Sequence, residues 1–217
     1  MLEFTGNCCA RVVNMEKGNL FIIATPIGNL SDISLRALDV LKEVDLILSE
    51  DTRETDKILK KYEIEKSQLS YRDQNHEAML PKIEEFLDNN LNVALISDSG
   101  TPLISDPGYK LVRELIRKGF NIVSIPGPSA VIAALVISGF PTDKFSFLGF
   151  LPKSSGDRSK ILKIYGSLDS TLVIYESPFR IEKLLKEIDE NLGDRFVCLA
   201  NEITKIHEKV TRGRVSL

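Results

Sequence analysis

Short apolar runs alternate with amphipathic stretches along almost the whole chain, and this alternation limits the folds that the chain can adopt. Residues 93–96 and 171–175 have the length and apolar content of buried strands. Between such runs, apolar residues recur at helical spacing, as in Leu35, Leu38 and Leu41. Strands that alternate with helices build a largely parallel sheet covered by those helices, because parallel neighbours need a long crossover connection. The fold class is therefore predicted to be α/β.

This pattern assigns an element to most of the chain. The predicted strands cover residues 20–24, 46–48, 93–96, 122–125, 145–148, 171–175 and 196–200. The predicted helices cover residues 34–43, 52–61, 76–89, 109–118, 129–137, 157–165 and 179–191. In the helix at 109–118, the spacing of Leu111, Leu115 and Ile116 predicts a common buried face.

Two breaks rich in Pro and Gly, at residues 126–128 and 139–141, divide the pattern. The helix between them, at 129–137, is almost wholly apolar, so we expect it to be buried on most sides. Such a helix between two sheets favours two α/β domains that share a cleft, at residues 15–126 and 127–217. One continuous sheet is the alternative.

The two ends of the chain differ from the rest. Residues 1–14 show no strand or helix periodicity and lack the apolar stretch of a secretory signal, whereas Met15 comes shortly before the first strand. We interpret residues 1–14 as a leader that is disordered or artificial. Because the sequence stops at Leu217 just as another element begins, we expect the second domain to be truncated.

The composition is that of an ordinary globular protein, with 43% hydrophobic and 27% charged residues. No apolar run approaches the length of a transmembrane helix. Three cysteines do not make a disulfide framework, and two distant histidines, His76 and His207, give no zinc pattern. The net charge of −3 gives no reason by itself to expect nucleic-acid binding. We expect a cytoplasmic protein without a metal.

Three predicted strands of the first half end in loops of Gly, Pro and small polar residues. These loops are residues 25–29 (TPIGN), 97–108 (SDSGTPLISDPG) and 126–130 (PGPSA). One such loop is usually only a turn. In a parallel sheet, however, the carboxyl ends of the strands meet at one edge, where open α/β sheets bind ligands. We therefore predict that the three loops ring a common pocket.

The residues of these loops limit the classes of ligand that the pocket could bind. There is no G-x-G-x-x-G after the first strand and no G-x-x-x-x-G-K-[ST], so dinucleotide and P-loop interpretations lose their main support. No Lys or Arg lies between residues 93 and 109 or between residues 122 and 136. A phosphate could still bind at helix N-termini. A neutral or zwitterionic ligand with a cationic centre fits Asp98 and Asp106 better.

Further polar residues follow other strands. Glu50, Asp51 and Arg53 open the helix at 52–61, and a cap from Asp51 or Thr52 would explain only one of the acids. We therefore consider this group part of the site. The polar segment 71–77 is either a mobile loop before a helix or the start of a surface helix that Asn75 or Asp73 caps.

Two more pairs, Glu176-Ser177 and Asn201-Glu202, are either site residues or ordinary strand ends. Basic residues also form two groups, which are Lys153, Arg158, Lys160 and Lys163, and Lys205, Lys209, Arg212 and Arg214. Charge runs are usually solvated faces. Contact with a phosphate backbone is the alternative, although no aromatic residues are interleaved to stack on a single strand.

The loop motifs resemble those of a known family. ATPIGNLSDISLRAL (24–38), SEDTR (49–53), SDSGTPLISDPG (97–108) and PGPSA (126–130) are similar to motifs of the tetrapyrrole methylase superfamily of S-adenosylmethionine-dependent methyltransferases. Within it, they resemble the branch that methylates the ribose 2′-hydroxyl of a cytidine in the decoding region of 16S ribosomal RNA. The resemblance extends from about Gly18 to Arg214 and implies two α/β domains, a cofactor in the cleft between them, a homodimer, and 16S ribosomal RNA or the small ribosomal subunit as partner.

The resemblance also implies which residues contact the cofactor. Gly100 to Pro102 stands where the superfamily often has Gly-Asp-Pro against the methionine part, and Thr101 in place of the acid is similar to the RNA-methylating branch. The implied cofactor-binding residues are Pro26, Gly100, Thr101, Ile104, Ser129, Ala130, Tyr175 and Glu176.

A sulfonium methyl group is already activated, so its transfer needs mainly positioning and a group that accepts the hydroxyl proton. The candidate bases are Asp98, Glu50, Asp51 and Asp106, with Asn29 and Arg53 as orienting groups. The sequence does not choose among them, and no metal is needed. Two alternatives remain, which are a small-molecule (tetrapyrrole) methylase of the same superfamily and a nonenzymatic metabolite-binding module.

Overall fold

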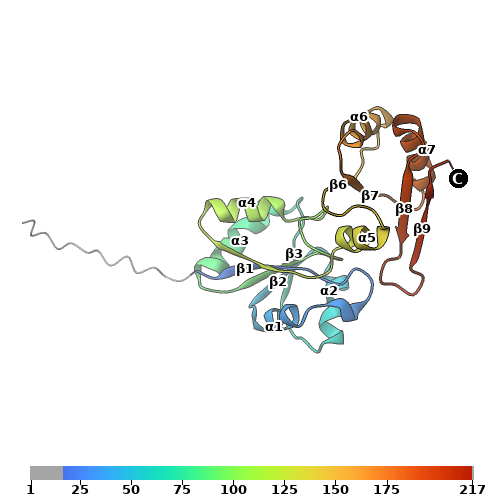
Figure 1. The fold of residues 1–217 in the computed structure, drawn as a ribbon. Coiled ribbons are helices and arrows are strands. Elements are labelled where there is room, and N and C mark those ends of the chain that lie inside the picture. The colour runs from blue at the N-terminus through green and yellow to red at the C-terminus, as the bar shows by residue number, and fades with distance from the viewer. Residues whose placement is uncertain (1–16, 217) are drawn as a thin grey trace, which may run out of the picture.

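The structure, a computed structural model, describes residues 17–216, so the leader predicted at residues 1–14 lies outside the described residues. The described chain forms two lobes (Figure 1). It passes from the first to the second between β5 (Asn121–Ile125) and α5 (Ala130–Ser138). The boundary that the sequence predicts, between residues 126 and 127, falls in this connection.

The first lobe contains a five-stranded sheet in the order β3-β2-β4-β1-β5. Its strands are β1 (Asn19–Ile23), β2 (Leu46–Ser49), β3 (Gln68–Ser70), β4 (Val93–Ile96) and β5. All neighbouring pairs are parallel. The carboxyl ends of β1, β2, β4 and β5 therefore lie at the same edge. This arrangement places the loops that follow these strands together.

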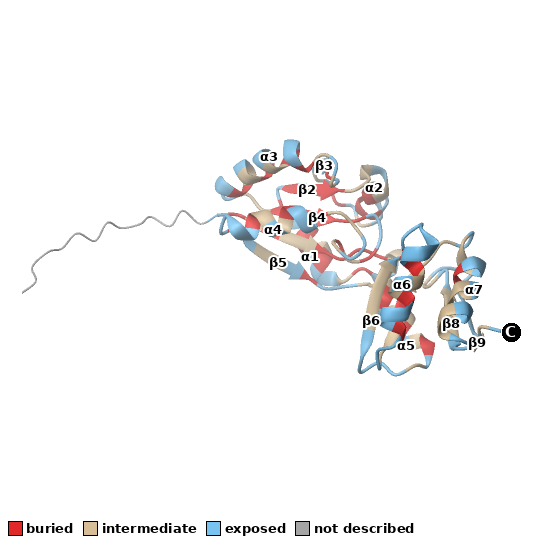
Figure 2. Cartoon of the chain, turned by 90° about the horizontal axis from the view of Figure 1, so that it is seen from above, coloured by how far each residue is buried: buried red, intermediate tan, exposed pale blue. Residues whose placement is uncertain are grey.

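Helices cover both faces of this sheet (Figure 1). They are α1 (Leu35–Glu43), α2 (Thr52–Lys61), α3 (His76–Asp88) and α4 (Tyr109–Arg117). Ile47 and Ala94 pack with α1 and α2, whereas their neighbours Leu48 and Leu95 pack with α3 and α4. Every residue of β2 and β4 is buried, as expected for strands covered on both faces. The buried residues concentrate in this lobe (Figure 2).

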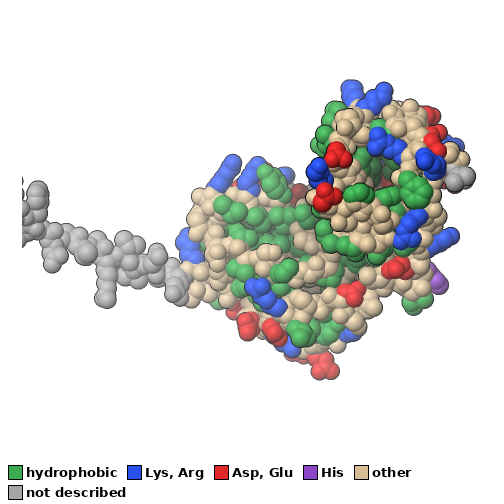
Figure 3. All heavy atoms as spheres, viewed as in Figure 1, with side chains coloured by type: hydrophobic (Ala, Val, Ile, Leu, Met, Phe, Trp, Pro, Cys, Tyr) green, Lys and Arg blue, Asp and Glu red, His purple; other side chains and the backbone are tan. Residues whose placement is uncertain are grey.

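The second lobe has less sheet. Its elements are α5, β6 (Phe145–Phe150), α6 (Ser155–Gly166), β7 (Thr171–Tyr175), α7 (Ile181–Leu192), β8 (Phe196–Asn201) and β9 (Lys209–Arg214). β6 and β7 form a parallel pair, and β8 and β9 form an antiparallel hairpin. The expectation of a largely parallel sheet is therefore wrong for the hairpin. Lys and Arg side chains gather over the α6 and α7 end of this lobe (Figure 3).

The predicted bounds agree with the structure to within two residues for every predicted element. The sequence did not predict β3, β9 or the short 3₁₀ helix Leu30–Asp32. Two predictions of burial are wrong. Ile116 is 58% exposed, because only Leu111 and Leu115 of α4 are buried. On α5, Val136 is 66% exposed, so this helix is buried on one face rather than on most sides.

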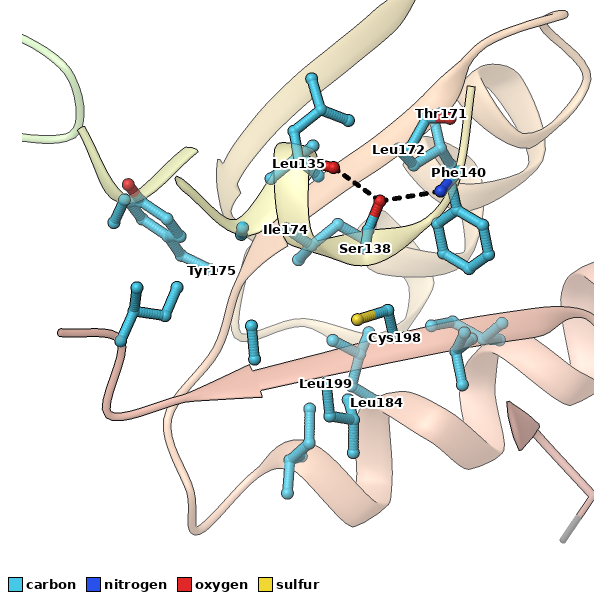
Figure 4. A pocket seen from close by; sticks show the side chains of 18 of the residues that line it. Leu135, Ser138, Phe140, Thr171, Leu172, Ile174, Tyr175, Leu184, Cys198 and Leu199 are labelled. Carbon is cyan, nitrogen blue, oxygen red and sulfur yellow. Dashed lines mark hydrogen bonds between the residues drawn. The ribbon is translucent and has the colours of Figure 1, made fainter. Parts of the chain in front are cut away.

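A cavity of about 630 Å³ lies in the second lobe. Its walls come from α5, β7, α7 and β8, and apolar side chains of Leu172, Ile174, Leu184 and Leu199 line it (Figure 4). The hydroxyl of Ser138 donates to the carbonyl of Leu135 at 2.7 Å, so its polar group is satisfied at the cavity wall. The cavity extends to Ile27, Ser99 and Ala130, which belong to or follow the loops of the first lobe.

Candidate functional site

The three loops that follow β1, β4 and β5 meet at the junction of the lobes. The backbone N–H of Thr25 donates to the carbonyl of Gly100 at 2.8 Å, and the N–H of Gly100 donates to the carbonyl of Thr25 at 3.1 Å. The hydroxyl of Thr101 donates to the carbonyl of Pro128 at 3.0 Å. The structure therefore brings together the loops that the sequence assigns to one pocket.

The loop after β4 has a strained backbone. Gly100 has φ +83°, and the non-glycine residues Leu103 and Ser105 have φ +73° and +65°. Side-chain-bearing residues seldom adopt this conformation, and such strain concentrates at functional sites. Gly108, with φ +123°, closes the loop where an added Cβ would lie 2.7 Å from Leu95. The loop is thus held in one shape by its contacts with the sheet.

The start of α2 contributes acids to the same edge. Asp51 is the N-cap of this helix, and its carboxylate accepts from the N–H of Arg53 at 2.9 Å. The same carboxylate receives both Nε and Nη2 of Arg53, at 2.9 and 2.5 Å. These bonds from Arg53 hold the pKa of Asp51 well below its usual range. The capping that the sequence suggested for Asp51 is therefore present.

Three other carboxyl groups lie together between this helix and the loop after β4. Asp98 accepts from the N–H of Asp51 at 2.8 Å. Burial raises the pKa of Glu50, Asp98 and Asp106, and the charges of neighbouring acids raise each pKa further. The pKa of Asp106 rises to about 6, mainly through burial and then through the charge of Glu50.

Arg72 is the cation beside this group. Its Nε donates to the carbonyl of Glu50 at 3.0 Å, and its charge lowers the pKa of both Glu50 and Asp98. Sequence reasoning did not single out Arg72. The polar segment 71–77 was the available signal, but Tyr71 and His76 of that segment are buried behind the sheet.

The second lobe supplies an aromatic wall opposite these acids. The ring of Tyr175 packs against Phe147 and Phe150 with centroids 4.8 and 5.5 Å apart. Burial raises the pKa of Tyr175, and the charge of Asp106 raises it further, which indicates that the two side chains lie close across the junction. Tyr175 and Ala130 both line the cavity, and Figure 4 shows Tyr175 at one end of it.

The structure separates other predicted residues from this group. Asn29 caps the 3₁₀ helix through a bond from the N–H of Ser31 at 3.0 Å, so its side chain is directed to its own loop. Arg53 has a side chain that is 85% exposed and is paired with Asp51. Glu176 has a side chain that is only 4% exposed, and its carboxylate pairs with Arg180 at 2.6 Å.

The remaining predicted cofactor residues lie in the loops themselves. Pro26 is buried directly after Thr25, whereas Ile104 is 43% exposed at the rim. Ser129 is the N-cap residue of α5, but it makes no side-chain cap hydrogen bond. The carbonyl of its neighbour Pro128 accepts the hydrogen bond from the hydroxyl of Thr101.

Among the described residues, no three His, Cys, Asp or Glu side chains are grouped in a way that could hold a metal ion. In the same part of the chain, no helix combines the length and the apolar character that a membrane span requires.

The fold matches those of two solved proteins. Diphthine synthase superposes with a TM-score of 0.71 at 19% identity, over 92% of this chain and 83% of that one. Uroporphyrin-III C-methyltransferase from Thermus thermophilus, in complex with S-adenyl homocysteine, gives a TM-score of 0.64 at 19% identity, over 91% and 89% of the two chains. At this level of identity, the likeness shows that these chains share a fold.

Sequence comparison defines the family. The family model described as Tetrapyrrole (Corrin/Porphyrin) Methylases matches residues 19–217. Ribosomal RNA small subunit methyltransferase I of Thermotoga maritima is 47% identical over 92% of this chain and 89% of its own. The protein of the same name from Halalkalibacterium halodurans is 42% identical over 91% of this chain and 68% of its own. The chain belongs to the tetrapyrrole methylase family, in the group of ribosomal RNA small subunit methyltransferases I.

Proposed function

We propose that this protein transfers the methyl group of S-adenosylmethionine to the ribose 2′-hydroxyl of a cytidine in the decoding region of small-subunit ribosomal RNA. The observation that carries the proposal is the group of three carboxyl groups with raised pKa at the junction of the lobes, opposite Tyr175. The relatives named as small-subunit ribosomal RNA methyltransferases support the substrate class.

The residues at the junction suit a cofactor with a cationic sulfonium and an aromatic adenine ring. Glu50, Asp98 and Asp106 supply negative charge, and Tyr175 and Ala130 supply an apolar wall. The solved relative in complex with S-adenyl homocysteine supports the same choice of cofactor. In our proposal Pro26, Gly100, Thr101, Ile104 and Ser129 shape the loop side of this site, as the sequence predicts.

S-adenosylmethionine, when bound, supplies an activated methyl group whose bond to sulfur breaks as the ribose oxygen bonds to the carbon. Positioning the hydroxyl in line contributes roughly 7–11 kcal/mol to such a step. The loop after β4 suits this task because its strained backbone is fixed by Thr25 and Pro128. The chain therefore contributes mainly alignment and proton acceptance.

We propose that Asp106 is the general base that accepts the proton of the ribose hydroxyl. A base works best when its pKa lies near the working pH, and the pKa of Asp106 rises to about 6. Asp51 suits this role poorly because Arg53 occupies its carboxylate and lowers its pKa. Asp98 is held by the N–H of Asp51, so we propose that it positions the helix start rather than accepts the proton.

We also propose that the protein acts as a homodimer in the cytoplasm, where ribosomal subunits occur. Exposed apolar side chains on α5, at Ile132 and Val136, offer a surface for self-association. Sedimentation analysis measures the state directly. A single species with the mass of one chain at micromolar concentration contradicts the dimer.

Transfer of tritiated methyl from S-adenosylmethionine to small ribosomal subunits that lack the modification tests the proposed function. We expect label in the RNA of these subunits. Cofactor binding by calorimetry, measured on the same preparation, verifies that the site is intact. Intact cofactor binding with no label in RNA contradicts the proposal, and label in a tetrapyrrole would identify the small-molecule alternative.

A further inference from the structure

A second, smaller cleft of about 190 Å³ lies in the second lobe, between the start of α6 and the start of α7. Four of its lining side chains are cationic and two are anionic, and they are Lys153, Arg158, Arg180, Lys183, Glu176 and Glu187. The cleft therefore has an excess of positive charge in a chain whose net charge is −3.

Each of the two arginines forms an ion pair with one of the two glutamates. Nε and Nη2 of Arg158 donate to the carboxylate of Glu187 at 2.6 and 2.5 Å, and its Nη1 donates to the carbonyl of Lys153 at 2.8 Å. Nη2 of Arg180 lies 2.6 Å from the carboxylate of Glu176. Such bidentate and buried pairs fix the walls of the cleft but leave little charge for a ligand.

The excess charge belongs to the two lysines. Lys153 and Lys183 are exposed, and neither forms an ion pair with another residue of the described chain. Lys183 is close enough to Glu187 to lower its pKa, so its ammonium lies at the edge of the cleft. A pair of ammonium groups without partners beside a shallow cleft suits a phosphate group.

An exposed aromatic side chain directly precedes a cleft residue in the chain. Phe179, in the loop between β7 and α7, is 98% exposed. The next residue along the chain, Arg180, lines the cleft. A fully exposed phenyl ring forfeits the free energy of burial, whereas a base can stack on its face. Cations with an adjacent exposed aromatic ring are the combination that binds single-stranded nucleic acid.

The cleft is also close to the reaction site along the chain. The loop that carries Phe179 begins directly after Tyr175, the residue whose pKa responds to Asp106. Glu176, the next residue, already lines the cleft. An RNA strand whose ribose reaches Asp106 would therefore have its neighbouring nucleotides near this loop.

We propose that this cleft is a nucleotide seat for the RNA substrate, in which Lys153 and Lys183 bind a backbone phosphate and Phe179 stacks on an adjacent base. The inference rests on the proposed RNA substrate and extends it to a particular contact surface. A purely structural role for the cleft would need the two arginine pairs alone. It would require neither the unpaired lysines nor the exposed ring.

The chain contains no tryptophan, so Phe179→Trp introduces a single fluorescent reporter. We expect a short cytidine-containing single-stranded RNA to quench it through stacking. Phe179→Ala should weaken binding of the same RNA by about five- to a hundred-fold, measured by anisotropy of labelled RNA. A matched reporter, Ile206→Trp, lies at a residue that is 97% exposed in the turn between β8 and β9 and should not respond.

The double variant Lys153→Ala/Lys183→Ala should reduce the slope of log affinity against log salt by about 0.7, because the one phosphate that the two lysines bind contributes about that much on a single strand. It should raise KM for small subunits and leave kcat and cofactor affinity unchanged. The control Lys163→Ala/Lys186→Ala removes two exposed charges from α6 and α7 outside the cleft and should leave the slope unchanged.

Equal salt slopes for the two double variants would overturn the proposal that the cleft binds a nucleotide. So would the absence of quenching by RNA of the reporter at position 179. Quenching by anionic phospholipid vesicles but not by RNA would also overturn it and would assign the surface to a membrane. These binding readouts need no turnover. Failure of methyl transfer by the parent chain would therefore contradict the proposed function, but it would not decide whether the cleft binds a nucleotide.

Discussion

The two lobes differ in how completely their β-sheets are covered and buried. In the first, a five-stranded sheet is covered on both faces and every residue of β2 and β4 is buried. In the second, two separate two-stranded sheets flank a cavity of about 630 Å³. Two-stranded sheets are only marginally stable by themselves. We infer that the candidate acids lie on the more rigid lobe. The cavity lining that the second lobe supplies can adjust more easily to a ligand.

This difference follows from how each lobe buries its strands. Leu48 and Leu95 of the first lobe are at most 2% exposed, while the strands of the second lobe contain a single buried residue, Val173. Local opening requires less free energy where fewer apolar contacts are lost. We therefore expect the acids at the junction to keep their geometry more closely than the strands of the second lobe do.

The largest expected effect comes from removing the proposed base on the rigid lobe. Asp106→Asn should lower kcat/KM for methyl transfer by about 10²–10⁴-fold, since a general base contributes that range. With the parent chain, log kcat/KM should rise with pH and level off above about 6, the pKa of Asp106. Asp143→Asn, at an exposed acid of the second lobe, is the matched control and should keep full activity. An Asp106→Asn variant with the parent pH profile contradicts the assignment.

The next effect compares equal truncations in the two lobes. Leu111 of α4 is 0% exposed, so Leu111→Ala should lower the free energy of unfolding by about 3 kcal/mol. Leu172 faces the cavity, where fewer atoms surround it, and Leu172→Ala should cost less than about 1 kcal/mol. Urea titration of each variant measures both values. Equal losses would break the contrast between the lobes.

Hydrogen exchange should report the same contrast without mutation. We expect backbone amides of β8 to exchange at least about tenfold faster than those of β4, because opening of the second lobe is local. Comparable protection factors in the two strands would show that the lobes open together. Saturation with S-adenosylmethionine should slow exchange at the end of β7 near Tyr175.

The smallest effect is on stability. The pKa of Asp106 rises from 3.8 to about 6 on folding, so the folded state binds its proton more tightly than the unfolded state does. Its contribution is therefore most favourable below pH 3.8 and is lost as the pH rises through 6. Asp106→Asn removes this loss and should stabilise the protein at pH 8, by on the order of 1 kcal/mol after allowance for solvent screening. Equal stability gains at pH 4 and pH 8 would contradict this explanation.

Much of the fold could be predicted from the sequence because strongly apolar runs specify strands. The bounds of β4 (Val93–Ile96) and β7 (Thr171–Tyr175) agree fully with the prediction. β3 was missed because it has only three residues, two of which, Leu69 and Ser70, are exposed. β9 was missed because Lys209–Arg214 is rich in charge, as suits an edge strand, and its pairing with β8 is tertiary.

The site could be predicted only in part. Parallel strands bring their loops to one edge, so the meeting of the loops after β1, β4 and β5 followed from the order of elements. The hydrogen-bond partners and pKa shifts of the individual acids could not be predicted from the order of elements. The bond between Asp98 and the N–H of Asp51 joins residues far apart in the chain, and it separates the two acids into different roles. Arg72 and Phe179 gave no periodic signal, because their environments depend on neighbouring loops.

The central claim is that loops of the rigid lobe align a ribose hydroxyl for methylation. The most direct measurement is nucleoside analysis of small-subunit RNA after incubation with the protein and methyl-labelled S-adenosylmethionine. We predict that the label appears in 2′-O-methylcytidine and that Asp106→Asn, with cofactor binding retained, abolishes it. Label on a base, or label of equal amount from the Asp106→Asn variant, would contradict the account.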